Sequence, residues 1–153
     1  MQAASREALH EAGHAVLAVL LGRKVERVSV RPRPQTRIVA APKLPRGRPR
    51  TDAQRARLES EIMLAVAGLA AERALDLDDR RSLLAAGADL HRATDLALQL
   101  AGRARAEPTL LHFLSVAQRM LRSRQDVLLD LAQALEEAGE LDGADVHARV
   151  PRR

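Results

Sequence analysis

Two histidines and a glutamate near the start of the chain constrain its structure more than any other feature of the sequence. His10, Glu11 and His14 lie in residues 8–21, which read Ala-Leu-His-Glu-Ala-Gly-His-Ala-Val-Leu-Ala-Val-Leu-Leu. Residues four apart on a helix project from the same face, so both imidazoles can reach one metal ion. The spacing therefore predicts a helix whose two histidines face a common point.

The position of Glu11 predicts hydrolytic chemistry at this point. Glu11 is about 100° round the helix from His10, so its carboxylate would lie beside a zinc ion and could take a proton from water. The alternative is that His10 and His14 are core histidines that bond to backbone groups. The string should arise by chance in roughly 1 of 200 chains of this composition, so spacing alone leaves both interpretations open.

A zinc site of this kind needs a third protein ligand and one position left for water. Residues 17 and 20 are both leucine, so the third ligand must come from a distant part of the chain. Asp89 and His91 are two residues apart and would point to different sides of a helix. Sequence geometry does not select the third ligand from the possible acidic and histidine side chains. The candidates are Glu59, Glu61, Glu72, Asp89, His91, His112 and His147.

Helices are expected to dominate the fold. The apolar residues are nearly all alanine, leucine and valine, and Phe113 is the only aromatic residue. Residues 62–71 are apolar on every side, which predicts a central buried helix. Apolar periodicity and capping residues predict helices over about 6–21, 51–73, 90–105, 108–122 and 124–138, with a connecting loop over 76–88 and a short final turn over 141–146.

A short two-strand element is expected beside these helices. Residues 25–30 are rich in valine and predict a strand, and residues 37–41 predict a second, short one. Prolines on both sides of the second strand place it at the edge of a sheet. The fold class is therefore mainly α (α+β), and a length of 153 residues fits a single domain over 1–153.

The positive charge of the chain is concentrated in residues 31–57. This segment holds nine basic residues against Asp52 alone and carries a formal charge of +8, whereas the rest of the chain is at −3. It also holds five of the seven prolines, so residues 31–50 predict a basic, proline-rich loop with an edge strand inside it. The segment is a solvated loop, a guide for acidic substrates or partners, or a contact for nucleic acid. The absence of tryptophan and tyrosine makes nucleic acid the least favoured of these.

The sequence contains no signal for a membrane or for an oxidising compartment. There is no cysteine, so disulfides and thiolate zinc sites are excluded. The apolar run over 62–71 is too short to span a bilayer, and the N-terminus lacks the pattern of a signal peptide. We therefore expect a cytoplasmic protein without membrane contact.

Five short segments together resemble the protease domain of the FtsH-type ATP-dependent zinc metalloproteases. Residues 8–16 (Ala-Leu-His-Glu-Ala-Gly-His-Ala-Val) resemble the active-site helix of that family, and residues 28–32 (Val-Ser-Val-Arg-Pro) the strand that follows it. Residues 61–72 (Glu-Ile-Met-Leu-Ala-Val-Ala-Gly-Leu-Ala-Ala-Glu) resemble its second helix, and residues 89–97 (Asp-Leu-His-Arg-Ala-Thr-Asp-Leu-Ala) the segment with the third zinc ligand. Residues 141–143 (Leu-Asp-Gly) resemble a signature near the end of the domain.

The resemblance implies a role for each site residue. His10, His14 and Asp89 would bind one zinc ion, Glu11 would be the general base, and Glu72 would orient a ligand histidine. Asp89 has an alternative as a capping residue of its helix. Glu72 has an alternative as the partner of a nearby arginine at a solvated helix end.

The resemblance also implies an activity, a zinc-dependent metalloendopeptidase that hydrolyses peptide bonds in unfolded proteins or peptides. An extended substrate could pair with the expected strand Arg37, Ile38, Val39, Ala40 and Ala41. The sequence shows neither the ATPase module nor the membrane helix of full-length members, so we expect ATP-independent activity unless a separate ATPase partner delivers substrates. Assembly into hexamers is implied by resemblance only. The alternative is a catalytically silent binding or regulatory module of the same fold, which contacts acidic partners or nucleic acid through residues 31–57.

Overall fold

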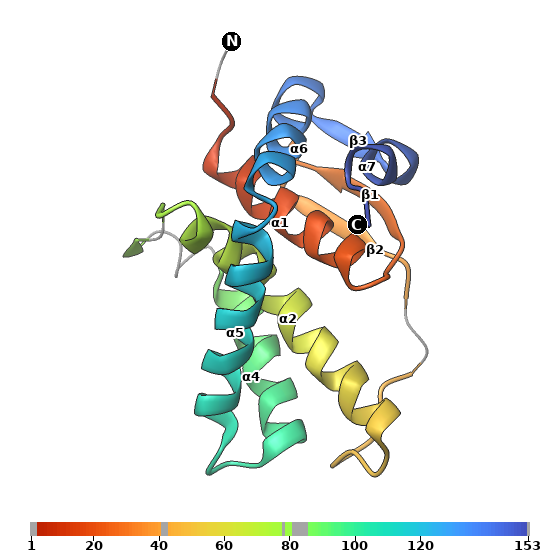
Figure 1. Ribbon diagram of the computed structural model, residues 1–153, viewed down its shortest axis with the longest axis vertical. Coiled ribbons are helices and arrows are strands. Elements are labelled where there is room, and N and C mark those ends of the chain that lie inside the picture. The colour runs from red at the N-terminus through yellow and green to blue at the C-terminus, as the bar shows by residue number, and fades with distance from the viewer. Residues whose placement is uncertain (1–2, 41–42, 78, 81–85, 153) are drawn as a thin grey trace.

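The structure is a computed structural model that describes residues 3–40, 43–77, 79–80 and 86–152. These residues form six helices and one small antiparallel sheet (Figure 1), which confirms the mainly α (α+β) class. The helices are α1 (Arg6–Leu20), α2 (Asp52–Ala74), α4 (Gly87–Ala101), α5 (Ala106–Arg122), α6 (Gln125–Ala138) and α7 (Gly143–Arg149). The strands are β1 (Val25–Ser29), β2 (Gln35–Ile38) and β3 (Glu140–Asp142).

Helices α1 and α2 form the centre of the molecule. The side chain of Ser5 caps α1 by accepting a hydrogen bond from the Ala8 N–H at 3.1 Å, as its position predicts. The two helices approach closely at Gly13, where an added Cβ would lie 2.5 Å from the Cβ of Ala71 and 2.8 Å from the carbonyl oxygen of Ala67. Their mutual position is therefore set by backbone packing, which leaves little freedom to shift one helix against the other.

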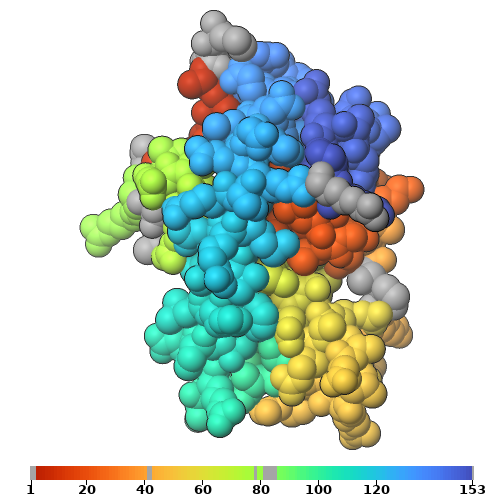
Figure 2. All heavy atoms as spheres, viewed as in Figure 1, coloured from red at the N-terminus to blue at the C-terminus, as the bar shows by residue number. Residues whose placement is uncertain are grey.

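The central part of α2 is buried on all sides, as its composition predicts. Every residue from 62 to 72 is buried, because α1, α4 and α5 all pack against this helix. Leu58 and Ile62 of α2 form a separate small cluster with Leu96 and Leu100 of α4. In the space-filling view, α2, α4, α5 and α6 form most of the visible face, and only part of α1 shows between them (Figure 2).

The sheet has the strand order β2-β1-β3, so β2 is an edge strand as predicted. Its predicted position over 37–41 is wrong. Pairing with β1 already begins at Gln35, opposite Ser29, and ends at Ile38. Val39 and Ala40 follow the strand, and residue 41 lies outside the described residues. The turn after β1 sets the register, so polar residues directly after Pro34 pair in preference to the more apolar residues that follow.

The third strand was not expected from the sequence. Residues 140–142 pair with β1, with Leu141 opposite Val28, where a simple turn was predicted. A strand of three residues carries little local signal, because its partner lies more than 100 residues earlier in the chain. The helix α7 begins directly after it, and the Asp142 side chain caps it by accepting from the Asp145 N–H at 2.9 Å.

The described part of the basic segment lies against the helices. The side chain of Gln99 on α4 donates to the carbonyl oxygen of Gly47 at 2.9 Å, and Arg57 on α2 donates to that of Lys43 at 2.9 Å. The loop predicted over 76–88 is shorter than expected at its end, since α4 begins at Gly87. Its residues 78 and 81–85 lie outside the described residues. Within the described part of the chain, every helix is too short or too polar to cross a bilayer.

Candidate metal centre

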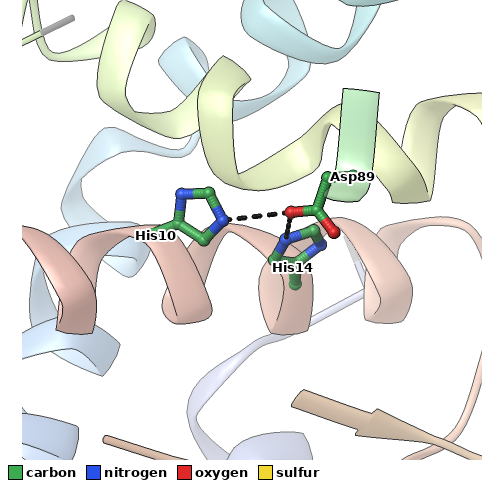
Figure 3. A group of neighbouring side chains, drawn as sticks. All are labelled: His10, His14 and Asp89. Atoms are coloured by element: carbon green, nitrogen blue, oxygen red, sulfur yellow. Dashed lines mark hydrogen bonds and ion pairs between the residues drawn. The ribbon is translucent and has the colours of Figure 1, made fainter. Parts of the chain in front are cut away.

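The two histidines of α1 point toward the same oxygen atom of Asp89, which comes from the first turn of α4 (Figure 3). The Nε2 atoms of His10 and His14 each lie 3.2 Å from Asp89 Oδ2. The three candidate ligand atoms all lie within 4.8 Å of one another, and among the described residues this is the one such group of three or more acidic or histidine side chains. The fold thus brings together three side chains that are up to 79 residues apart in the chain.

The second nitrogen of each imidazole also has a partner, and both partners belong to α2. His10 Nδ1 lies 3.0 Å from Glu72 Oε1, and His14 Nδ1 lies 2.8 Å from the carbonyl oxygen of Leu64. A carboxylate and a carbonyl accept hydrogen bonds, so each ring donates its Nδ1–H to α2 and directs its Nε2 toward Asp89. This is the orientation in which histidines bind metals.

Helix α2 can supply these partners because it approaches the histidines at a glycine. A Cβ added at Gly68 would lie 2.2 Å from His10 Nε2, far inside van der Waals contact. Glu72 follows one turn later and is 1 % exposed, so its carboxylate is shielded from solvent where it contacts His10. The solvated position that the alternative assigns to Glu72 is therefore wrong, and its pairing with an arginine stays a prediction.

Glu11 is held beside the histidines by the edge strand. Its side chain is buried, and the Thr36 hydroxyl on β2 donates to Glu11 Oε2 at 2.6 Å. Thr36 Oγ1 also lies 3.1 Å from the backbone oxygen of Glu11, which ties the strand to the helix at this residue. One carboxylate oxygen is thereby fixed, and the group keeps the acceptor capacity that a general base needs.

Proton equilibria in the site follow from these contacts. Burial alone would lower the pKa of His10, but the hydrogen bonds to Asp89 and Glu72 outweigh it and raise that pKa to about 9. Burial alone would raise the pKa of Asp89, but the hydrogen bonds from His10 and His14 lower it well below its usual range. Without a metal ion, these shifts favour a protonated His10 beside an ionised Asp89.

The donor set and its spacing fit a zinc ion. Two imidazole nitrogens and one carboxylate oxygen are ligands that zinc accepts, and a tetrahedron with arms of about 2.0 Å has edges of about 3.3 Å. The two 3.2 Å separations from Asp89 to His10 and His14 match these edges. The residues present are therefore suited to one zinc ion.

Two cavities adjoin the site and meet at Glu11 and Asp89. The His14 pocket has a volume of about 640 Å³ and extends from the site along β2. The His10 pocket, also about 640 Å³, lies on the other side and is lined by His10 and Glu72. A catalytic zinc site needs one coordination position open to water and substrate, and the two pockets provide access to it.

The other candidates for a third ligand lie elsewhere or have other partners. His91 is 83 % exposed and pairs with Asp95 at 3.6 Å, so it does point away from Asp89 as predicted. His147 Nε2 accepts a hydrogen bond from the Val25 N–H at 3.0 Å. Glu61 forms ion pairs with two arginines, and Glu59 and His112 line a separate pocket. Asp89 is not the capping residue of α4, because that position is held by Ala86.

Three contributors to the site were missed by the sequence analysis. The Leu64 carbonyl is a backbone group, so the pattern of side chains cannot predict its contact with His14. Thr36 lies in a segment predicted as irregular, because the strand was placed two residues too late. Gly68 carried a usable signal, since a glycine inside a buried, alanine-rich helix often marks the close approach of another group.

The comparisons with known proteins agree with this geometry. A search of curated proteins finds no match to the chain. A comparison with protein-family models matches residues 1–103 to peptidase family M41. The match covers about two thirds of the chain and includes His10, Glu11, His14, Glu72 and Asp89. It confirms the resemblance to a metalloprotease domain, and the chain belongs to peptidase family M41.

Proposed function

We propose that this protein is a zinc-dependent metalloendopeptidase. The observation that carries the proposal is the convergence of His10 Nε2 and His14 Nε2 on one oxygen of Asp89, 3.2 Å from each, with Glu11 on the same helix. Family membership supports a peptidase, and the donor set supports zinc as the metal.

Each residue of the site has a distinct part in the proposed reaction. His10, His14 and Asp89 hold the metal, and Glu72 and the Leu64 carbonyl orient the two imidazoles. When bound, zinc would act as a Lewis acid toward the scissile carbonyl and its water. Glu11 takes a proton from the attacking water and gives it to the leaving amine, which completes the cleavage of the peptide bond.

The edge strand β2 supports an extended substrate. Gln35, Thr36 and Ile38 of this strand line the His14 pocket, and among the described strands only β1 pairs with β2, on one of its two sides. A peptide in extended conformation could add to the other side through backbone hydrogen bonds, which accept many sequences. A folded protein does not offer such a strand, so unfolded proteins and peptides are the proposed substrates.

The proposal is tested by the variant Glu11→Gln, which keeps the shape of the side chain and removes its basicity. We expect the rate of cleavage of an unfolded protein to fall by about 10²- to 10⁴-fold, the usual contribution of a general base. Zinc content, measured by elemental analysis, should stay near one ion per chain in both proteins. The matched control is Glu26→Gln on β1, an exposed glutamate outside both pockets, which should cleave like the wild type.

Two outcomes would contradict the proposal. One is purified protein that binds no zinc when the metal is supplied. The other is cleavage that continues at the wild-type rate in Glu11→Gln, which would point to a contaminating protease or to a different base.

A further inference from the structure

The His14 pocket carries an excess of positive charge that the metal site does not use. Apart from the site residues Glu11, His14 and Asp89, its charged lining among the described residues consists of Arg23, Lys43 and Arg92 against the single carboxylate of Glu61. These four side chains carry a net charge of +2. They come from different parts of the chain, namely the segment before β1, the segment after β2, α4 and α2.

Glu61 neutralises only part of this charge. Its side chain is 13 % exposed and pairs closely with Arg23, which also donates to the carbonyl oxygen of Val39 at 3.1 Å. Arg92 reaches Glu61 only at 3.5 Å and its side chain is 58 % exposed. Lys43 is exposed and forms no ion pair within the described part of the chain. Arg92 and Lys43 are therefore the two cations with capacity for a further anion.

The His10 pocket, on the other side of the site, lacks such an excess among the described residues. Apart from the site residues, its one described cation is Arg6, which is paired with Asp79 at 2.7 Å, and Glu7 lies in the same lining. Pro34, the residue before β2, borders this pocket, whereas Ile38 at the end of β2 borders the His14 pocket. A substrate that follows β2 past Glu11 would thus have one half in a basic pocket and the other half in a pocket without net positive charge.

The direction of the substrate follows from strand pairing. Antiparallel pairing is slightly more stable per residue than parallel pairing. A peptide antiparallel to β2 begins at the Ile38 end and leaves at the Pro34 end. The residues before its scissile bond would then occupy the His14 pocket.

We infer that the protein selects peptides with aspartate or glutamate on the N-terminal side of the scissile bond, and that Arg92 and Lys43 recognise this carboxylate. The inference rests on the proposed peptidase function and adds a substrate class to it. Arg23 is not part of the recognition, because Glu61 and the Val39 carbonyl already engage it.

The inference is tested first by mapping cleavage. Wild-type protein with zinc is incubated with a mixture of peptides from a denatured proteome, and the cleavage sites are read by mass spectrometry. We expect acidic residues to be enriched before the scissile bond by about three- to tenfold over asparagine and glutamine, the range of one to two exposed ion pairs. The enrichment should weaken at high salt, because exposed charges are screened.

Binding gives a second measurement that does not depend on cleavage. Zinc-loaded Glu11→Gln is titrated with three peptides that carry one tryptophan and differ only in an aspartate, asparagine or lysine. The protein has neither tryptophan nor tyrosine, so the fluorescence of the peptide is observed without background. We expect the aspartate peptide to bind about three- to tenfold more tightly than the asparagine peptide, and the lysine peptide to bind least.

Substitutions then test whether Arg92 and Lys43 cause the preference for acidic peptides. In the Glu11→Gln background, Arg92→Gln and Lys43→Gln should each lower the ratio of aspartate to asparagine binding, and the double variant should bring it near one. Arg92→Glu should make the lysine peptide the tighter ligand. The control Arg119→Gln, an exposed arginine on α5 outside both pockets, should keep the wild-type ratio.

The two proposals fail separately. If the wild type does not cleave, the peptidase function is contradicted, while the binding ratio still decides the preference for acidic peptides. Equal binding of the three peptides would overturn the inference. A ratio that survives the double substitution, or an acidic preference on the C-terminal side of the scissile bond, would overturn it as well.

Discussion

The two sides of the candidate metal site are built in different ways. On the α1–α2 side, His10 and His14 are backed by buried groups, and the helices are in close contact at Gly13 and Gly68. On the α4 side stands Asp89, whose side chain is 36 % exposed. Its helix begins at Gly87, and the capping residue Ala86 provides no hydrogen bond from a side chain.

The difference separates ligand side chains whose positions are set by core packing from the one whose orientation would be set by the metal ion. On the α1–α2 side, the positions of the imidazoles follow from core packing and exist before any ion binds. On the α4 side, the helix packs on α2, but the hydrogen bonds of the Asp89 side chain in the described residues are with the two histidines, so the orientation of its carboxylate depends on what those imidazoles bind. Changes on the first side should therefore affect folding, and changes on the second should affect metal binding alone.

Alanine substitutions of glycines on the two sides give the largest expected contrast. Gly13→Ala should lower the free energy of unfolding by about 3 kcal/mol, because the new methyl group meets the backbone of Ala67, which cannot move away. Gly87→Ala on α4 has nothing within 4 Å of the new Cβ and should be neutral or stabilising by up to about 1 kcal/mol. Urea denaturation of the metal-free proteins measures both values. Equal destabilisation by the two substitutions would break the comparison.

Asp89→Asn tests the α4 side directly. Loss of the ligand charge should weaken zinc binding by more than about 100-fold, since a ligand contributes more than the groups that orient it. The half-exposed carboxylate should contribute about 1 kcal/mol or less to the stability of the metal-free protein. Competition with a zinc chelator and urea denaturation measure the two effects. A collapse of the fold in Asp89→Asn would show that α4, too, is part of the preformed side.

Glu72→Gln tests the preformed side without adding bulk. The amide can still accept from His10 Nδ1 through its oxygen but loses the charge, so zinc affinity should fall by about 10- to 100-fold. The same chelator competition measures it, with Glu26→Gln as the control because Glu26 is exposed on β1. An unchanged affinity would mean that core packing alone orients His10.

The same difference explains how much of the site the sequence could predict. His10, Glu11 and His14 lie on one helix, so their relative directions follow from the helical period alone. The distance of Asp89 from the histidines depends on where α4 packs, and no local sequence pattern predicts this. Only the resemblance to a protease family selected Asp89 from the seven candidates. The structure brings Asp89 to the histidines, and its role as a ligand stays a prediction.

The fold shows the same limit. The long helices were predicted because apolar periodicity over 15 or more residues is a strong signal. The edge strand β2 was placed two residues too late and β3 was missed, because short strands are defined by their partners and not by their own residues. Thr36 was lost with the first of these errors, since its contact with Glu11 exists only in the observed register.

The pH dependence of the site compares its two sides at a single residue, His10. The pKa of His10 in the metal-free protein is raised from 6.5 to about 9, more by Asp89 on the α4 side than by Glu72 on the α2 side. Its proton therefore stabilises the metal-free fold fully below about pH 6.5, and this contribution is lost as the pH rises through about 9.

Zinc must displace this proton, so its apparent affinity should rise between about pH 6.5 and 9, by at most about tenfold per pH unit. Zinc titrations across this range measure the slope, and NMR titration of the His10 imidazole measures the pKa directly. Asp89→Asn should lower that pKa more than Glu72→Gln does. The reverse order would mean that the buried carboxylate of Glu72, and not the exposed one of Asp89, holds the proton, and the preformed side would then also control the charge of the site.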